Sequence, residues 1–220
     1  KADISLLGNS LRINVWGNNL SFLDEKYEPF IVIEDASLYQ FLEPWIIIKN
    51  QGKFGAYHEY GEKILPPVYD EIDTYYTHLL ARKGEEYFVY DRGKRTTESI
   101  GVYSSARIAR NGQVIAQNTD GSFVLPLSET PEHTYQSLTD PTDDVIVAKE
   151  ASGIGLINME GNYILKPVID ELTHLEENYF YAKNSNEYLL LNALSTTADI
   201  RYNSFHRISI EHDVMVEYIH

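Results

Sequence analysis

A stretch of 27 residues occurs twice in this chain, with the copies one hundred residues apart. The first copy, IIIKNQGKFGAYHEYGEKILPPVYDEI, covers residues 46–72, and the second, IVAKEASGIGLINMEGNYILKPVIDEL, covers residues 146–172. An internal repeat of this kind predicts similar units that pack against their neighbours. Both copies share, without a gap, the residues found at Ile46, Lys49, Gly55, Gly61, Ile64, Leu65, Pro67, Val68, Asp70 and Glu71.

Weaker copies lie between and after these two. At an offset of sixty residues, the segment 51–67 aligns with 111–127, and Gly61 then corresponds to Gly121. Residues 1–45 are predicted to be an N-terminal cap or a sixth, degenerate unit. With Phe54 as the marker, five units spaced by 33, 27, 40 and 34 residues are predicted, with markers at Phe54, Tyr87, Val114, Ile154 and Tyr188.

Apolar residues within a unit alternate or run in short blocks, which is typical of strands. The runs 46–48, 55–57 and 63–65 predict three strands separated by glycine-rich turns. Pro67 is predicted to end the third strand, because proline cannot donate a hydrogen bond to a neighbouring strand. Residues 69–72 then form a short strand or a helical turn that leads into the next unit. Each unit is therefore predicted to contain three or four short antiparallel strands.

The predicted fold is an all-β array of five to six such units. Unit spacings of 27 to 40 residues favour an open, solenoid-like array. A closed propeller is the alternative, although its blades usually need about 40 residues. The array is predicted to cover residues 46–220, with an inserted loop at 127–144, where two prolines and five acidic residues interrupt the pattern.

The repeated unit resembles the bacterial WG-repeat (KWG-repeat) family. The resemblance is carried by Gly-Lys-Phe-Gly at residues 52–55, by Ile-Leu-Pro-Pro-Val-Tyr-Asp-Glu-Ile at 64–72, and by the second copy at 152–172. Other residues replace the family's tryptophan at every marker position. The resemblance implies an all-β binding or scaffolding array, often exported or associated with the cell envelope, and it supplies no catalytic residues. Phe54 is then expected to plug the core between units, and Gly55 to allow close backbone approach.

Composition excludes several kinds of site and partner. There is no cysteine, so disulfides, thiolate metal sites and cysteine nucleophiles are absent. A net charge of −15 disfavours nucleic acid and anionic membrane surfaces as partners. No apolar run approaches the roughly 20 residues that span a bilayer, so no membrane insertion is predicted. The chain begins at Lys1 rather than methionine, which we interpret as a mature or trimmed fragment and as favouring export over a cytoplasmic location.

No motif in the chain predicts catalysis, a cofactor or a metal. The seven histidines lack metal-ligand spacing, and no phosphate-binding loop, nucleophile elbow or dinucleotide fingerprint occurs. Asp70 and Glu71 recur as Asp170 and Glu171. Adjacent carboxylates on a strand point to opposite faces, so we expect a structural role, such as accepting backbone hydrogen bonds at a turn.

The tyrosine-rich connectors that follow the two best copies are the predicted binding segments, together with the inserted loop. Outward aromatic rings suit a sugar or a protein partner, whereas inward rings belong to the core. The candidate binding residues are Tyr75, Tyr76, Tyr179 and Tyr181 from the connectors, and His133 and Tyr135 from the loop.

The predicted function is a non-catalytic binding or scaffolding protein that acts through an extended β surface, with another protein as partner in the bacterial cell envelope. The alternatives are a glycan- or cell-wall-binding module, an acidic inhibitor of the immunity type with a basic partner and, least favoured, a carboxylate-dependent hydrolase. The oligomeric state stays open. Function is expected where the two best copies differ.

Overall fold

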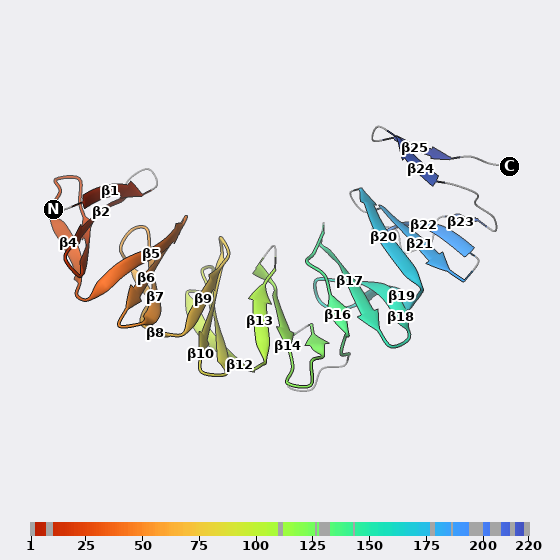
Figure 1. Ribbon diagram of the computed structural model, residues 1–220, viewed down its shortest axis with the longest axis horizontal. Coiled ribbons are helices and arrows are strands. Elements are labelled where there is room, and N and C mark those ends of the chain that lie inside the picture. The colour runs from red at the N-terminus through yellow and green to blue at the C-terminus, as the bar shows by residue number, and fades with distance from the viewer. Residues whose placement is uncertain are drawn as a thin grey trace. The chain divides into compact units, whose positions relative to one another are not determined.

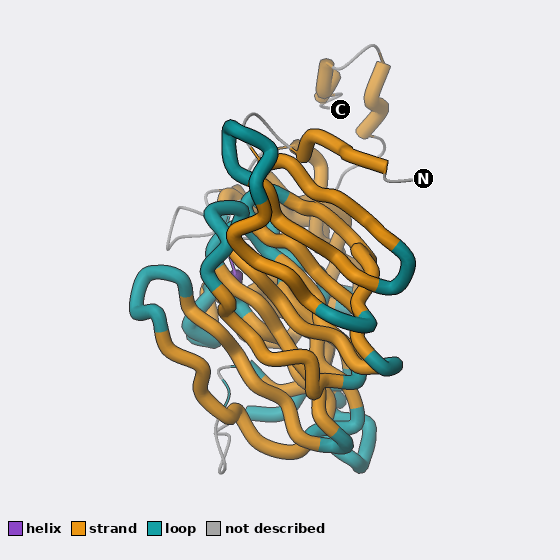
Figure 2. The backbone as a smooth tube through the Cα atoms, turned by 90° about the vertical axis from the view of Figure 1, so that its left-hand side faces the viewer, coloured by secondary structure: helices purple, strands orange, loops and turns teal. Residues whose placement is uncertain are grey.

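The structure is a computed structural model, shown in Figure 1. It describes residues 3–7, 11–109, 112–125, 127, 133–142, 144–176, 179–185, 187–193, 200–202, 208–211 and 214–217. These residues form short strands joined by turns and contain no α-helix, and strands make up most of the trace in Figure 2. The predicted all-β class is confirmed.

Small antiparallel sheets follow one another along the described chain. Five of them have four strands, and in these each strand pairs with the next in sequence. This confirms the prediction of three or four strands per unit. The first three sheets are β1 (Asp3–Leu7), β2 (Leu11–Trp16), β3 (Asn19–Leu23) and β4 (Pro29–Ile33); β5 (Ala36–Leu42), β6 (Trp45–Asn50), β7 (Lys53–His58) and β8 (Lys63–Tyr69); and β9 (Glu71–Thr74), β10 (His78–Lys83), β11 (Glu86–Asp91) and β12 (Thr96–Val102).

The chain divides into two compact units, residues 1–114 and 115–220, and the division falls in the fourth sheet. That sheet has three strands, and a two-stranded hairpin follows the sixth sheet. The remaining sheets are β13 (Ser105–Ile108), β14 (Val114–Gln117) and β15 (Phe123–Val124); β16 (Ser137–Leu138), β17 (Val145–Glu150), β18 (Gly153–Asn158) and β19 (Tyr163–Ile169); β20 (Glu171–Glu176), β21 (Tyr179–Asn184), β22 (Glu187–Asn192) and β23 (Ile200–Tyr202); and β24 (Ile208–Glu211) and β25 (Val214–Glu217).

Strand β6 of the second sheet is buried on both faces, which explains its continuous apolar run. Ile46 and Ile48 of β6 pack in a cluster with β2 and β3 of the first sheet. Trp45 and Ile47, on the opposite face of the same strand, pack in a cluster with β10 and β11 of the third sheet. Side chains alternate along a strand, so a strand covered on both faces needs apolar residues at consecutive positions. The core is thus a series of clusters between successive sheets.

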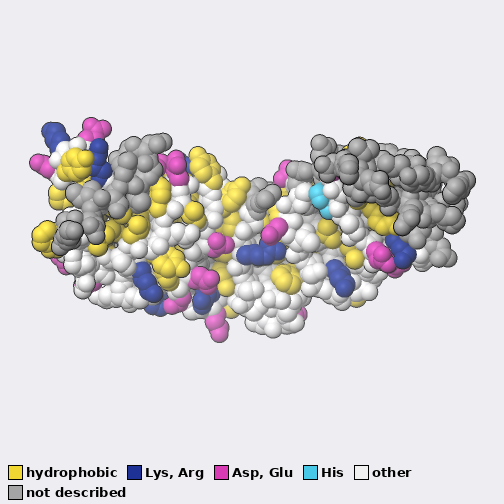
Figure 3. All heavy atoms as spheres, turned by 45° about the horizontal axis from the view of Figure 1, so that its top comes forward, with side chains coloured by type: hydrophobic (Ala, Val, Ile, Leu, Met, Phe, Trp, Pro, Cys, Tyr) yellow, Lys and Arg dark blue, Asp and Glu magenta, His cyan; other side chains and the backbone are white. Residues whose placement is uncertain are grey.

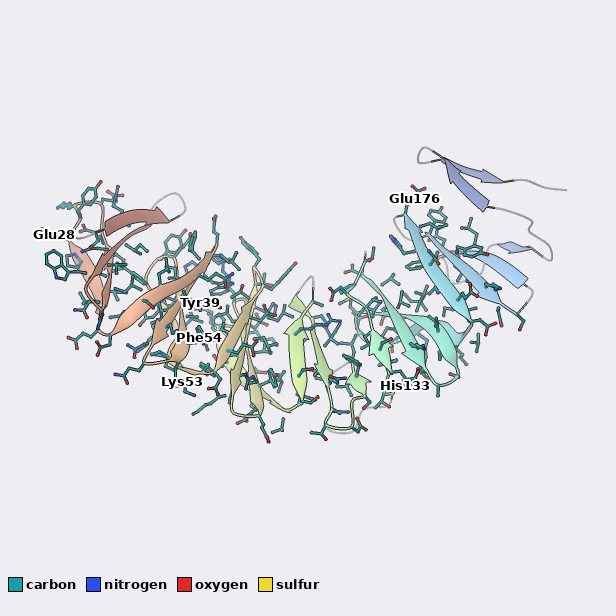
Figure 4. All side chains as sticks on the ribbon, viewed as in Figure 1. Glu28, Tyr39, Lys53, Phe54, His133 and Glu176 are labelled. Atoms are coloured by element: carbon teal, nitrogen blue, oxygen red, sulfur yellow. The ribbon has the colours of Figure 1, made fainter. Side chains whose placement is uncertain are left out.

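The marker residue Phe54 lies at the margin of the cluster between the second and third sheets, as expected for a residue that packs between units. Its ring meets the edge of Tyr39 from β5 at a centroid distance of 4.8 Å, and both residues are labelled in Figure 4. The ammonium of Lys49 lies 5.3 Å from the Phe54 centroid. Two side chains of the same sheet therefore cover the part of Phe54 that the core leaves open.

The glycine after the marker lies where two backbones approach closely, which confirms the expectation for this position. A Cβ on Gly55 would lie 2.9 Å from the nitrogen of Pro67, and one on Gly155 would lie 2.5 Å from the carbonyl oxygen of Leu165. The pairing of β7 with β8 shifts at this point, between Phe54 and Ala56. The shift marks a β-bulge, a place where one strand carries extra residues.

Pro67 does not end its strand, and that prediction is wrong. β8 continues to Tyr69, and β19 continues past Pro167 to Ile169. Both are the last strands of their sheets, and the bulge opposite the glycine already interrupts the ladder. An edge strand with a bulge can hold a proline, because no neighbouring strand needs its missing N–H.

The acidic pair joins one sheet to the next, as the expected structural role requires. Asp70 lies between β8 and β9, and its carboxylate accepts a hydrogen bond of 2.8 Å from the Gly84 N–H in the β10–β11 turn. The Lys53 ammonium donates to the same carboxylate. In the second copy, Asp170 accepts a bond of 2.6 Å from the Ser185 N–H. Each aspartate therefore ties the connector to a hairpin turn of the following sheet.

The structure corrects the register of the units at one position. Phe54 and Ile154 pair with Tyr69 and Ile169 of their fourth strands, and in the fourth sheet the residue paired in this way is Phe123, with Tyr135. Val114 lies in the preceding strand β14 and is not the equivalent of Phe54. The alignment at an offset of sixty matched two glycine turns, residues 58–62 and 118–122, because they have the same hydrogen-bond pattern. The first turn joins the third and fourth strands of its sheet, whereas the second joins β14 to β15, the second and third strands.

The corrected markers are more evenly spaced than the predicted ones. They are 34, 33, 36, 31 and 34 residues apart, at Leu20, Phe54, Tyr87, Phe123, Ile154 and Tyr188. The uneven spacing used to favour an open array came from the Val114 assignment. It disappears when Phe123 takes that place.

Two predicted boundaries can be compared with the strands. Within the predicted N-terminal segment 1–45, strands β1 to β4 form a four-stranded sheet, and β5 already belongs to the second sheet. Within the predicted loop 127–144, Tyr135 bridges to Phe123, and β16 pairs with β17 as the first strand of the fifth sheet. The described residues 133–142 therefore complete two sheets. Residues 126, 128–132 and 143 lie outside the described part of the chain.

Candidate functional site

The two best copies share their scaffold and differ along one edge. In a four-stranded meander, the turn between the first two strands and the turn between the last two lie at the same edge. At that edge, the first copy has aromatic and ionisable residues where the second has amide or acidic ones. The pairs one hundred residues apart are His58 and Asn158, Tyr60 and Glu160, Glu62 and Asn162, and Tyr76 and Glu176.

These turns lie at one end of the strands and not along an outermost strand. We call this end of the first three sheets the turn edge. It consists of the turns β3–β4 (residues 24–28), β5–β6 (43–44), β7–β8 (59–62), β9–β10 (75–77) and β11–β12 (92–95). Hydrogen bonds link neighbouring turns: the Glu59 N–H donates to the Pro44 carbonyl at 2.9 Å, and the Arg92 N–H donates to the Thr77 carbonyl at 2.9 Å. The Arg95 guanidinium donates to Glu62 at 2.6 Å and joins the second sheet to the third.

A stack of rings runs from the surface of the turn edge into the core. Tyr60 is 74% exposed and stacks on His58, with a centroid distance of 4.9 Å and an interplanar angle of 30°. His58 meets the edge of the buried Trp45 at 5.8 Å, and Trp45 meets Tyr90 at 5.8 Å. The Trp45 indole N–H donates to the Tyr75 carbonyl at 2.6 Å. The exposed ring of Tyr60 therefore rests on buried, hydrogen-bonded neighbours.

The imidazole of His58 is neutral at pH 7. Burial of the ring lowers the pKa of His58 below its ordinary value of 6.5, and the nearby charge of Arg92 lowers it further. The Tyr60 N–H donates to Nδ1 of His58 at 3.3 Å, so Nδ1 acts as the acceptor of a neutral ring. Burial also raises the pKa of Tyr90, which keeps its hydroxyl protonated.

Three tyrosines of the turn edge are more than half exposed, and the chain's own arginines cover two of them. The Arg12 guanidinium lies 4.8 Å from the ring centroid of Tyr27. The Arg92 guanidinium lies 5.3 Å from that of Tyr76. Among the described residues, no lysine or arginine lies over Tyr60. The exposed fractions of Tyr27, Tyr60 and Tyr76 are 57%, 74% and 60%.

The predicted binding residues are distributed over several places. Tyr76 lies exposed on the turn edge, and Tyr75 beside it is half-buried with its carbonyl bonded to Trp45. Tyr179 is 37% exposed at the start of β21, and Tyr181 is half-buried two residues on. The structure therefore brings only Tyr75 and Tyr76 together with the stack below Tyr60.

The two candidates from the predicted loop are packed within the second compact unit, residues 115–220. His133, labelled in Figure 4, is half-buried with its ring centroid 4.9 Å from that of Tyr163. Tyr135 is 1% exposed, and its hydroxyl lies 3.5 Å from the Gly161 carbonyl. A ring this deeply buried offers no face to a surface ligand.

Sequence reasoning missed Tyr60, His58, Tyr27 and Arg92. Tyr60 was interpreted only as part of a hairpin loop, because its neighbour Gly61 marks the turn. For Tyr60 and His58 the available signal was the comparison of the two copies, which differ at these two positions.

The described residues hold no group of three or more histidine, aspartate or glutamate side chains placed to bind a metal ion. No helix in the described part of the chain is long and apolar enough to cross a membrane. The chemistry of the turn edge is that of aromatic rings, guanidinium groups and carboxylates at the surface.

Comparison with known proteins gives a family match and distant structural likenesses. Among solved structures, the chain is similar to Kluyvelomyces marxianus Hsv2 at 11% identity and a TM-score of 0.40, over 86% of this chain and 77% of that one. It is similar to the Neurospora crassa Pan2 WD40 domain at 13% identity and a TM-score of 0.32, over 89% and 76%. No curated protein matches the chain in sequence.

The family model described as the WG containing repeat matches residues 154–188. The match runs from the third strand of the fifth sheet to the third strand of the sixth, that is, from one marker residue to the next. The chain therefore carries the WG repeat that the sequence resemblance predicted, and residues 154–188 are one copy of it.

Proposed function

We propose that this chain is a non-catalytic binding repeat protein whose partner is another protein, held along the turn edge of the first three sheets. The cell envelope, which the family resemblance implies, is the compartment included in this proposal. The observation that supports it most directly is the exposed ring of Tyr60, backed by His58 and Trp45 and flanked by the turn of Tyr76. Rigid, exposed aromatic residues are enriched where proteins bind each other.

The differences between the two copies support the same surface. A residue needed for folding is expected in both copies, as Gly55 and Asp70 are. Tyr60 and Tyr76 occur in one copy only: Glu160 occupies the turn of Tyr60 in the second copy, and Glu176, at the position of Tyr76, is the last residue of β20. Their aromatic rings are therefore not required by the repeat.

Glycan binding is the second candidate, and one observation favours it. The ring of Tyr60 has one open face and lies near the carboxylates and guanidinium groups of its turn and the next. A flat ring beside hydrogen-bonding groups also suits a sugar. We also propose the connector residues Tyr179 and Tyr181 as contacts, whether the partner is a protein or a glycan.

The test uses affinity capture with the full chain and two variants. The double variant Tyr60→Glu/Tyr76→Glu carries the residues that the second copy has at these positions, so we expect the sheets to tolerate them. Trp16→Glu changes a residue that is 66% exposed at the opposite edge, in the β2–β3 turn, and serves as the control. Thermal unfolding of each variant checks the fold.

We expect proteins captured reproducibly by the wild-type chain and by Trp16→Glu to be lost from the double variant. Equal capture by the wild type and the double variant would exclude the turn edge as the surface. Retention on a glycan array that the double variant abolishes, without protein capture, would favour the glycan alternative.

A further inference from the structure

Tyr60 differs from the other exposed tyrosines of the turn edge in what covers its ring. Tyr27, in the β3–β4 turn, occupies the same step of its meander as Tyr60 does in the β7–β8 turn. Arg12 lies over Tyr27 at 4.8 Å, and Arg92 lies over Tyr76 at 5.3 Å. The chain's own guanidinium groups therefore cover two of these three rings. Among the described residues, none covers the third, Tyr60.

The groups around Tyr60 suit a cation on the free face. The opposite face rests on the neutral imidazole of His58, so no positive charge lies beneath the ring. The carboxylates of Glu59 and Glu62, in the same turn, lie close enough to act on His58, as do the guanidinium groups of Arg92, which lies over Tyr76, and Arg95, which is paired with Glu62. The open face of an aromatic ring attracts an ammonium or a guanidinium, and carboxylates beside it add hydrogen-bond acceptors.

We propose that the free face of Tyr60 receives an arginine or lysine side chain from a basic segment of the partner protein. This inference rests on the proposed function and gives the partner its chemistry. Glu62 is available to such a cation, because its ion pair with Arg95 is at the surface, with side chains 53% and 67% exposed. Surface pairs of this kind contribute little and exchange readily.

The charge of the whole chain favours the same class of partner. The net charge of −15 attracts a basic segment at long range and repels an acidic one. On the face shown in Figure 3, acidic and basic side chains are interspersed, so long-range attraction alone selects no single spot there. The uncovered ring of Tyr60 supplies the local preference.

The experiment titrates the full chain with a tetra-arginine peptide, using a tetra-glutamate peptide and a neutral oligosaccharide as comparison probes. Tyr60→Leu removes the ring, Tyr60→Phe keeps it without the hydroxyl, and Trp16→Leu removes an exposed ring at the opposite edge. Binding is followed by calorimetry and by the ring resonances of labelled tyrosine. Arg12→Ala is included because it uncovers Tyr27.

We expect Tyr60→Leu to weaken tetra-arginine binding by about two- to fivefold, the range of a cation–π contact at an exposed site. Tyr60→Phe and Trp16→Leu should stay within the error of the wild type, and Arg12→Ala should add binding at Tyr27. Equal affinity of the wild type and Tyr60→Leu would overturn the inference. Preference for the acidic peptide or for the oligosaccharide would do so as well.

This result separates the inference from the proposed function. The double variant could lose protein capture while the wild type shows no preference for the basic peptide. That outcome would support the turn edge as the docking surface and exclude a basic side chain on Tyr60. Tyr60-dependent peptide binding with unchanged capture would keep the cation site and reject the turn edge as the partner's docking surface.

Discussion

Asp70 and Asp170 show how one side chain can hold two successive sheets in register. Each lies between the last strand of one sheet and the first strand of the next. Each carboxylate accepts a hydrogen bond from a backbone N–H in a turn of the later sheet. The bond from Lys53 and the bond from the Gly84 N–H lower the pKa of Asp70 below its ordinary value of 3.8. Ionised Asp70 therefore stabilises the folded state.

Replacing Asp70 by asparagine should destabilise the protein at neutral pH and leave little difference in strong acid. A carboxyl group with a lowered pKa in the folded state stabilises the fold above its unfolded pKa, and this contribution is lost as the pH falls below about 4. Thermal unfolding of Asp70→Asn and wild type from pH 7 to pH 3 tests this. Glu85→Gln, an exposed change in the β10–β11 turn that Asp70 contacts, is the control. A stability difference between Asp70→Asn and wild type that stays constant down to pH 3 would contradict the argument.

His58 should make stability depend on pH in a second, higher range. Its pKa is lowered in the folded state, so the unfolded chain binds more protons just below pH 6.5 and stability falls as the pH falls. His58→Asn installs the residue found at Asn158. We expect the variant to lose less stability than the wild type between pH 7 and pH 5, measured by urea unfolding. Parallel pH profiles would show that His58 does not titrate on unfolding.

At the scale of the strand, the bulge opposite Gly55 and Gly155 determines where the last strand of the sheet bends. The glycines leave room for the backbone of the proline-containing strand, which a side chain would fill. The sequence shows the conserved glycine and proline of the two copies, yet it does not show that they lie opposite each other. Pro67 was therefore taken as the end of a strand that continues to Tyr69.

Alanine at these glycines should destabilise the fold, and more at Gly155 than at Gly55. The nearest atoms to the new Cβ are backbone atoms at 2.5 Å for Gly155 and 2.9 Å for Gly55, and backbone cannot rotate away. We expect a loss of about 1–3 kcal/mol from the free energy of unfolding. Urea denaturation measures it, with Gly93→Ala as the control, because the nearest atom there is the side-chain oxygen Oδ1 of Asp91 at 3.2 Å. The reverse order of the two losses would count against the bulge geometry.

Strand positions could be predicted from the sequence because they depend on local alternation and on turn glycines. The register of the fourth sheet could not, because the turns at residues 58–62 and 118–122 have the same local pattern at different steps of the meander. The site was harder still. Tyr76 was predicted because it lies in a tyrosine-rich connector, but the stack of Tyr60 on His58 joins a turn to the core through contacts that no local pattern encodes.

At the scale of the whole molecule, charge is the property with the widest effect. The chain has 33 acidic and 18 basic residues, and its net charge of −15 opposes compaction. Several carboxylates are engaged in ion pairs such as Arg82 with Glu71 and Lys183 with Glu171. Because acidic residues are in excess, we expect repulsion between carboxylates to outweigh these surface pairs.

Salt should therefore stabilise the protein. Raising the NaCl concentration from roughly 0.05 to 0.5 M shortens the screening length and weakens the long-range repulsion. Each ~1 kcal/mol gained raises the melting temperature by about 2–4 °C for a chain of this size. Differential scanning calorimetry across this range tests the prediction, with an uncharged osmolyte as the control. A melting temperature that falls with NaCl would mean that the ion pairs dominate.

The matched WG repeat, residues 154–188, runs from the third strand of the fifth sheet to the third strand of the sixth, so this copy contributes to two sheets. This overlap bears on how such a chain can grow. An in-frame duplication of one marker-to-marker length, 34 residues as between Ile154 and Tyr188, supplies two strands to the sheet before it and two to the sheet after it. We therefore expect that gaining or losing one such period would leave complete four-stranded sheets.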